Sequence, residues 1–178
     1  MRIIWILVLL LGGCSKFGKI RHPDWEVGQW VSYKINSEPL KISIVGRDSS
    51  LFWVETVEPE LIVKVLVRPE EINHPIRLIV KRTGENPTEF QETKLSIESN
   101  FTIQNLEDSG KEEVLILPCG KIKTIHIERE ETDIWLSSTI PILGVVKYTN
   151  KNMNIVLQSY GMRGATSEIK EPVENVSL

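Results

Sequence analysis

The chain has 178 residues, of which 41% are hydrophobic and 25% are charged, and its formal net charge is −3. These fractions are those of a globular protein and exclude a disordered chain, and the length is that of a single domain. Because basic residues are not in excess, we expect no nucleic-acid partner, and two cysteines exclude a disulfide-rich scaffold.

The features of a secretory signal peptide follow one another in the expected order at the N-terminus. Arg2 is followed by an uninterrupted apolar run, Ile3 to Leu11, which is too short for a membrane-spanning helix of about 20 residues. The run ends in Leu11-Gly12-Gly13-Cys14, which resembles the lipobox of bacterial lipoproteins. The resemblance implies cleavage before Cys14, a diacylglyceryl group on its thiol and acylation of the new amino group, with palmitate among the chains. We therefore expect residues 1–13 to be a signal peptide and Cys14 to carry the lipid anchor.

Residues 14–24 are expected to form a lipidated tether. Their basic groups fit either contact with anionic lipid headgroups or a solvated linker, and these groups are Lys16, Lys19, Arg21 and His22. Ser15 follows Cys14 at the position where, in lipoproteins of enteric bacteria, an Asp tends to retain the protein at the inner membrane. The resemblance therefore favours the outer membrane over the inner one, with the domain in the periplasm or at the cell surface.

Residues 25–161 predict β-structure almost throughout, because apolar and polar residues alternate in short runs bounded by Gly, Pro, Asn or Asp. One-sided alternation is typical of antiparallel strands with one face in water. We expect an all-β domain of about ten or eleven strands with little helix, arranged as a single curved antiparallel sheet or an incomplete barrel. The expected strands lie near residues 28–35, 40–44, 51–57, 61–68, 76–81, 95–103, 113–117, 121–128, 134–138, 145–148 and 154–159.

Other segments depart from this pattern. Residues 69–73 and 89–93 are weak candidates for about a turn or two of helix. Asn150-Lys151-Asn152 is expected to close a hairpin. The periodicity is lost after residue 161, so residues 162–178 are expected to form a disordered tail.

Several motifs stand out in the β domain: Gly28-x-Trp30-x-x-Tyr33, the turn Pro118-Cys119-Gly120, a strand with Trp135, and the step Pro141-Ile142-Leu143-Gly144. Together they resemble the motifs of a family of uncharacterised bacterial periplasmic proteins. Cys119 departs from the Ala usual at that turn. Such domains are similar to the carrier and receptor proteins of the lipoprotein-sorting pathway, which fold as a curved, incomplete antiparallel barrel around an apolar cavity. The resemblance implies this fold.

Aromatic and aliphatic residues suggest where a ligand would bind. If the concave face of the sheet is open, it is wide enough to hold acyl chains. The candidate ligand-binding residues are Trp53, Trp135, Ile140, Ile142, Leu143 and Val145. The segment Ile140–Val146 is almost wholly apolar although it surrounds a predicted turn. It is therefore the mouth of a ligand cavity, a part of the core, or a contact with a partner.

Metal binding and catalysis have little support in the sequence. His126 and Glu128 share a strand face, but no C-x-x-C or H-E-x-x-H motif supplies further ligands, so we expect an exposed polar face without a metal or other cofactor. Cys119 precedes His126 by about 20 Å of extended chain, and a small half-buried residue at a turn is expected there rather than a nucleophile. We expect no catalytic residues and no enzymatic activity.

These patterns predict a lipid-anchored envelope lipoprotein that binds or carries a lipid or a hydrophobic protein segment through an apolar concave face. The alternative is a structural or interaction lipoprotein with a filled core that acts through its surface. An envelope hydrolase is a third hypothesis, which requires titratable groups that converge in a cleft.

Overall fold

The structure of the chain is a computed structural model that describes residues 24–72, 74–91, 110–170 and 174–176. These residues form strands and one short 3₁₀-helix, η1 (Pro69–Glu71). The strands are β1 (Trp30–Ile35), β2 (Glu38–Asp48), β3 (Leu51–Val57), β4 (Leu61–Val67), β5 (Arg77–Arg82), β6 (Thr88–Gln91), β7 (Lys111–Leu117), β8 (Gly120–Arg129), β9 (Thr132–Leu136), β10 (Val145–Asn150), β11 (Asn154–Gly161) and β12 (Glu174–Val176).

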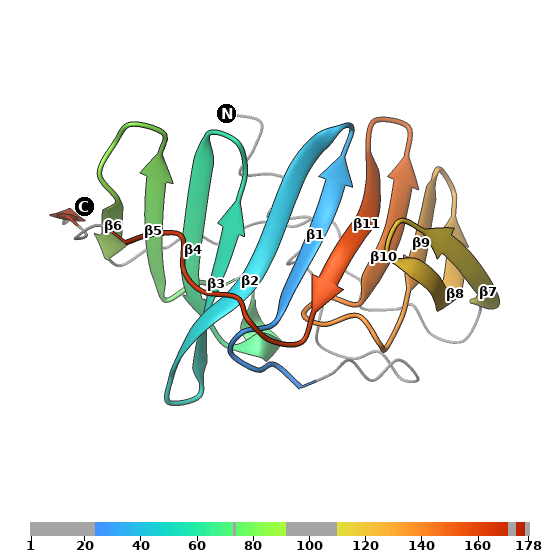
Figure 1. Cartoon of the computed structure of the whole chain (residues 1–178), viewed down its shortest axis with the longest axis horizontal. Helices are drawn as coiled ribbons and strands as arrows, with labels where there is room; N and C mark the ends of the chain where they lie inside the picture. The colour runs from blue at the N-terminus through green and yellow to red at the C-terminus, as the bar shows by residue number, and fades with distance from the viewer. Residues whose placement is uncertain (1–23, 73, 92–109, 171–173, 177–178) are drawn as a thin grey trace.

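All strands belong to one sheet, in the order β12-β6-β5-β4-β3-β2-β1-β11-β10-β9-β8-β7. The chain runs outward from β1 to β6, resumes at the other end of the sheet with β7, and returns to the centre with β11, which pairs with β1 (Figure 1). Neighbouring strands are antiparallel except β12, which pairs with β6 in parallel. The prediction of an all-β fold with a single unclosed antiparallel sheet is confirmed.

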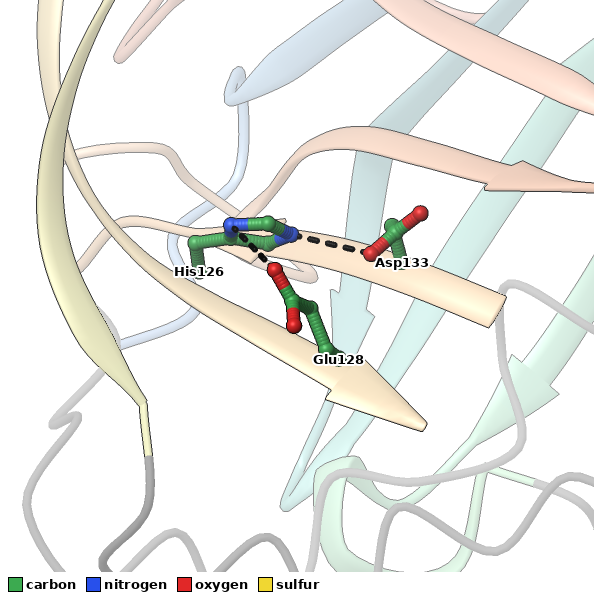
Figure 2. A group of neighbouring side chains, drawn as sticks. All are labelled: His126, Glu128 and Asp133. Carbon is green, nitrogen blue, oxygen red and sulfur yellow. Dashed lines mark hydrogen bonds and ion pairs between the residues drawn. The ribbon is translucent and has the colours of Figure 1, made fainter. Parts of the chain in front are cut away.

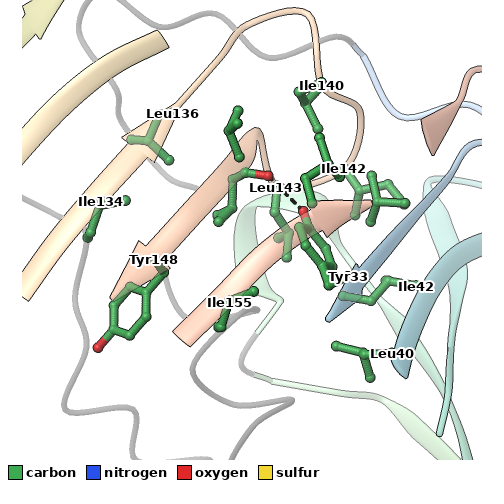
Figure 3. Packing of buried hydrophobic residues seen from close by; sticks show 14 of the residues in the cluster. Tyr33, Leu40, Ile42, Ile134, Leu136, Ile140, Ile142, Leu143, Tyr148 and Ile155 are labelled. Atoms are coloured by element: carbon green, nitrogen blue, oxygen red, sulfur yellow. Dashed lines mark hydrogen bonds between the residues drawn. The ribbon is translucent and has the colours of Figure 1, made fainter. Parts of the chain in front are cut away.

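One face of the sheet, called the inner face here, carries the hydrophobic core. Tyr33 of β1 lies opposite Leu40 of β2 and Leu157 of β11, and none of the three side chains is more than 2% exposed. Because side chains alternate along a strand, the same face continues through Ile42, which is fully buried (Figure 3). In β3 it continues through Val54, which lies opposite Ile44 and is also fully buried. Each such side chain contributes about 1.5–3 kcal/mol of burial free energy.

The loop between β9 and β10 helps to fill the inner face. Its residues Ile140 and Ile142 have no exposed surface, and Ile142 adopts a φ of 69°. A β-branched residue in this left-handed region is strained by about 1–3 kcal/mol. The indole N–H of Trp25 donates a hydrogen bond of 3.1 Å to the Ile142 carbonyl, and the Trp25 ring meets Phe52 edge-on at 5.7 Å. The loop conformation is therefore held by both its backbone and its side chains.

The opposite face, called the outer face here, is crossed by the C-terminal segment. After β11 the chain turns back over β2, β3 and β4 toward β6 (Figure 1). The Ser167 hydroxyl and the Glu168 N–H donate hydrogen bonds of 2.5 Å and 2.7 Å to the carboxylate of Glu55, which is only 1% exposed. The sequence predicted a disordered tail from residue 162, whereas residues 162–170 lie along the sheet and 174–176 form β12. Backbone and hydroxyl contacts of this kind leave no periodicity in a sequence.

The weaker local predictions have mixed outcomes. The helix candidate at residues 69–73 is confirmed in part as η1, whereas the candidate at 89–93 is wrong, since β6 occupies its start. The hairpin at residues 150–152 is confirmed by the pairing of β10 with β11. The strand predicted at residues 95–103, the signal peptide and most of the tether lie outside the described residues.

Candidate functional site

The structure separates the six predicted ligand-binding residues into two groups on opposite faces of the sheet. The aliphatic group occupies the inner face, where exposed fractions do not exceed 5%, and consists of Ile140, Ile142, Leu143 and Val145. The two tryptophans, Trp53 and Trp135, point the other way, because their neighbours in β3 and β9 belong to the inner face. The six residues therefore do not line one common surface.

The inner-face group is part of the protein's own core in the described structure. The Tyr33 hydroxyl donates a hydrogen bond of 3.0 Å to the Val145 carbonyl, and complete burial raises the pKa of this phenol well above its usual range. Ile142 and Leu143 project toward the same Tyr33 ring (Figure 3). Among the three roles that the sequence left open for Ile140–Val146, the structure places the segment in the core. Ligand binding there stays a prediction.

Trp53 lies in a charged environment on the outer face. The Lys64 ammonium and the Arg77 guanidinium lie 5.3 Å and 5.1 Å from the centre of its ring, distances at which cation–π attraction acts. Arg77 also forms an ion pair with Glu89, whose hydrogen bond raises the pKa of the guanidinium. Burial lowers the pKa of Lys64, and nearby Glu55 opposes this effect. Trp53 thus packs among charges and not in an apolar pocket.

Trp135 is the centre of a polar cluster at the other end of the sheet. Its ring stacks on the imidazole of His126, with centroids 4.2 Å apart and planes inclined by 8°. Its indole N–H donates a hydrogen bond of 2.8 Å to Oε2 of Glu113, and the ammonium of Lys147 lies 4.3 Å from the centre of the ring. These contacts bring together side chains from β7, β8, β9 and β10.

His126 is surrounded by carboxylates (Figure 2). Its Nε2 lies 3.1 Å from Oδ1 of Asp133, and its Nδ1 lies 3.5 Å from Oε2 of Glu113 and 3.9 Å from Oε1 of Glu128. One ligand atom from each of His126, Glu128 and Asp133 can be chosen so that all three atoms lie within 4.8 Å of one another. We call these three residues the His–carboxylate cluster.

The sequence analysis found His126 and Glu128 but missed Asp133 and Glu113. The missing signal is the register of the β8–β9 hairpin, in which Glu128 lies opposite Asp133 and His126 lies opposite Trp135. A two-residue turn at positions 130 and 131 would have fixed this register from the sequence. Pairing across the hairpin brings Asp133 to His126 and Glu128 as a third potential ligand, which no sequence motif supplied, and the expectation of a polar face without a metal stays a prediction.

Cys119 lies in the turn between β7 and β8, as predicted, and is a half-buried free thiol. Burial raises the pKa of this thiol, which lowers the fraction of thiolate at neutral pH. The environment gives no support to a nucleophilic role.

Two hollows are lined by described residues. One, of about 580 Å³, is lined by residues that include Glu113, Thr124 and 136–139 but by no residue of the His–carboxylate cluster. The other, of about 450 Å³, lies between the β1–β2 and β3–β4 turns, where burial raises the pKa of Glu58. The predicted ligand-binding residues line neither hollow. Within the described part of the chain, no helix has the length and apolar character needed to span a membrane.

Comparison with protein-family models and with curated proteins finds no match for this chain.

Proposed function

We propose that the protein is a lipid-anchored lipoprotein of the bacterial envelope whose β domain has a filled interior and acts through its surface. The observation that carries this choice is the complete burial of Ile140 and Ile142 against the inner face of the sheet. The anchor part of the proposal rests on the lipobox-like sequence that ends at Cys14. The outer membrane is the favoured location, because Ser15 and not Asp follows Cys14.

The energetics of the interior favour this proposal over a carrier that holds a lipid against the inner face. A ligand there would have to displace at least Ile140, Ile142 and Leu143, each of which contributes about 1.5–3 kcal/mol through burial. The total of about 5–9 kcal/mol is comparable with the whole stability of a domain, about 5–15 kcal/mol. The hydrogen bond from Trp25 to the Ile142 carbonyl would also have to break. A filled interior is therefore the less costly state.

Leu143→Glu tests whether the interior is core. Because Leu143 is only 4% exposed, the variant buries a carboxylate without a partner, and we expect its thermal transition to be lost or lowered by at least about 10 °C. Ser138→Glu, at an exposed position in the same loop, is the matched control and is expected to melt like the wild type. A Leu143→Glu protein that melts like the wild type would contradict the filled interior.

Native mass spectrometry of the full chain purified from membranes tests the anchor and the carrier hypothesis together. We expect covalent acyl chains on Cys14, absent from Cys14→Ala, and no additional lipid held non-covalently. Palmitate feeding should label the wild type only, and equal labelling of Cys14→Ala would refute the anchor. A stoichiometric non-covalent lipid in the wild type would instead support the carrier.

A further inference from the structure

We propose that the His–carboxylate cluster of His126, Glu128 and Asp133 is a binding site for one divalent transition-metal ion, with Zn²⁺ as the representative ion. The site lies on the outer face, at the hairpin of β8 and β9 (Figure 2). It shares no residue with the lipid anchor or with the filled interior.

The spacing of the ligand atoms fits such an ion. Zn²⁺ binds imidazole nitrogen and carboxylate oxygen at about 2.0–2.2 Å, which puts neighbouring ligands of a tetrahedral site about 3.3–3.5 Å apart. Nε2 of His126 and Oδ1 of Asp133 are already 3.1 Å apart. Oε1 of Glu128 lies 3.9 Å from Nδ1 of His126 and belongs to the same group of atoms within 4.8 Å. Its side chain is 68% exposed, so its carboxylate reaches an ion bound at Nε2 by rotating about the side-chain bonds.

The carboxylates of the cluster create a negative charge that a bound cation would stabilise. Glu128 and Asp133 are directly opposite each other in the β8–β9 register, an arrangement of like charges that destabilises a sheet. Glu113 adds a third carboxylate on the far side of the imidazole. Of the nearby lysines, Lys147 lies over the Trp135 ring, and Lys111 lies opposite His126 on the edge strand with an exposed side chain. A divalent ion between Glu128 and Asp133 would neutralise the two negative charges that repel each other.

The surroundings hold the imidazole in an orientation suited to a metal. Stacking on Trp135, which is 8% exposed, fixes the plane of the His126 ring. When Nε2 binds the ion, the ring carries its proton on Nδ1, which lies 3.5 Å from the Glu113 carboxylate and, before Glu128 rotates onto the ion, 3.9 Å from the Glu128 carboxylate. Glu113 is in turn held by the indole N–H of Trp135. A carboxylate behind a metal-bound histidine is a common outer partner that fixes the tautomer and strengthens the ligand.

The ligand types select the class of ion. Imidazole nitrogen favours Zn²⁺ and other transition metals, whereas Ca²⁺ and Mg²⁺ prefer sites made of oxygen alone. Three protein ligands leave a fourth position for water or for a group from another molecule. The half-exposed carboxylates, with Asp133 42% and Glu113 45% exposed, leave this position accessible from solvent.

The test is calorimetric titration of ZnCl₂ into the full chain in detergent, after stripping with EDTA and dialysis. We expect one saturable site, and we expect affinity to fall at least tenfold in His126→Ala and in Glu128→Gln. Glu128→Gln is included because its exposed side chain has no part in packing, so that loss of binding cannot be attributed to misfolding. Glu113→Gln is expected to weaken binding by about tenfold without abolishing it, as an outer partner should.

His74→Ala is the matched control, since His74 is exposed and lies beyond η1, away from the cluster. It is expected to bind Zn²⁺ within twofold of the wild type. Co²⁺ provides a second readout, because visible absorption bands of a tetrahedral Co²⁺ site should appear in the wild type and in His74→Ala but not in Glu128→Gln. No saturable binding by the wild type, or wild-type affinity in both His126→Ala and Glu128→Gln, would overturn the proposal.

Discussion

The buried carboxylate of Glu55 offers a sharp test of how the C-terminal segment is attached. Ser167 donates its hydroxyl hydrogen to Oε2 of Glu55 at 2.5 Å and accepts a hydrogen bond of 3.2 Å from the Lys64 ammonium. Glu55 also accepts from the Glu168 N–H at 2.7 Å. The substitution Ser167→Ala removes this hydroxyl donor to the carboxylate, and with it the acceptor of the Lys64 ammonium and of the Ile169 N–H.

The magnitude follows from the burial of the acceptor. A hydrogen bond to a charged group contributes about 1.5–3 kcal/mol, and water cannot replace the lost donor because Glu55 is only 1% exposed. For a domain of this size, 1 kcal/mol corresponds to about 3 °C in Tm. We therefore expect Ser167→Ala to lower the Tm by about 4–9 °C. The ion pair of Lys41 with Glu168, at 3.7 Å between half-exposed groups, adds little.

The measurement is thermal unfolding followed by circular dichroism, with Thr166→Ala as the matched control. Thr166 is the exposed neighbour of Ser167, and removing its hydroxyl should change stability by less than about 0.5 kcal/mol. The double variant Glu55→Gln with Ser167→Ala should be less destabilised than the sum of the single variants, since both remove the same contact. A Ser167→Ala protein that melts within 1 °C of the wild type would refute the attachment of the segment to Glu55.

Three further predictions concern the core and the turns. Tyr33→Phe should cost about 1 kcal/mol at pH 7, because the Val145 carbonyl loses its donor, and the difference should narrow as the pH rises above about 10. Burial raises the pKa of Tyr33, so above about pH 10 the folded state keeps a proton that the unfolded state releases. The free energy of unfolding of the wild type should therefore fall by up to about 1.4 kcal/mol per pH unit in that range. Urea unfolding at pH 7 and pH 10.5 measures this change. Cys119→Ala should change stability by less than about 1 kcal/mol, and in the Cys14→Ala background the Cys119 thiol should react with Ellman's reagent more slowly than free cysteine at pH 7, since burial raises its pKa. Gly161→Ala should cost about 1–3 kcal/mol in urea unfolding, because its Cβ would lie 2.4 Å from Nε1 of Trp30.

The fold class could be predicted from the sequence because its signals are local. In β1, Tyr33 and Ile35 alternate with the polar residues Ser32 and Lys34. The turns at Cys119 and at residues 150–152 are marked by Pro, Gly and Asn. The pairing of β1 with β11 leaves no such mark, because the two strands are separated by most of the described chain. The order in which the two halves of the sheet pair could therefore not be predicted from local patterns in the sequence.

The candidate sites could likewise be predicted only as far as they depend on local sequence, and not where they depend on strand pairing. The sequence assigned Trp53 and Trp135 to an apolar surface from their composition alone, yet the register gives them charged neighbours on the outer face. Asp133 became a partner of His126 only through the β8–β9 pairing. Composition indicates what a side chain prefers, whereas the register decides which neighbours it has.

The start of the β domain limits how far the proposed metal site can lie from the proposed lipid anchor. Trp25 and Gly28 follow the tether directly and are bound to three distant segments: Trp25 to the Ile142 carbonyl, and Gly28 to the Ile44 carbonyl and the Ala165 N–H. If Cys14 carries the anchor, a tether of about ten residues reaches at most about 35 Å from the bilayer to this bound segment. A metal ion at the His–carboxylate cluster would then lie no farther from the membrane surface than the tether length plus one domain diameter. If a molecule at that surface supplies the fourth ligand, Zn²⁺-dependent crosslinking from Glu131→Cys, an exposed turn position that leaves all three ligands in place, should be lost when a long flexible linker is inserted after Cys14.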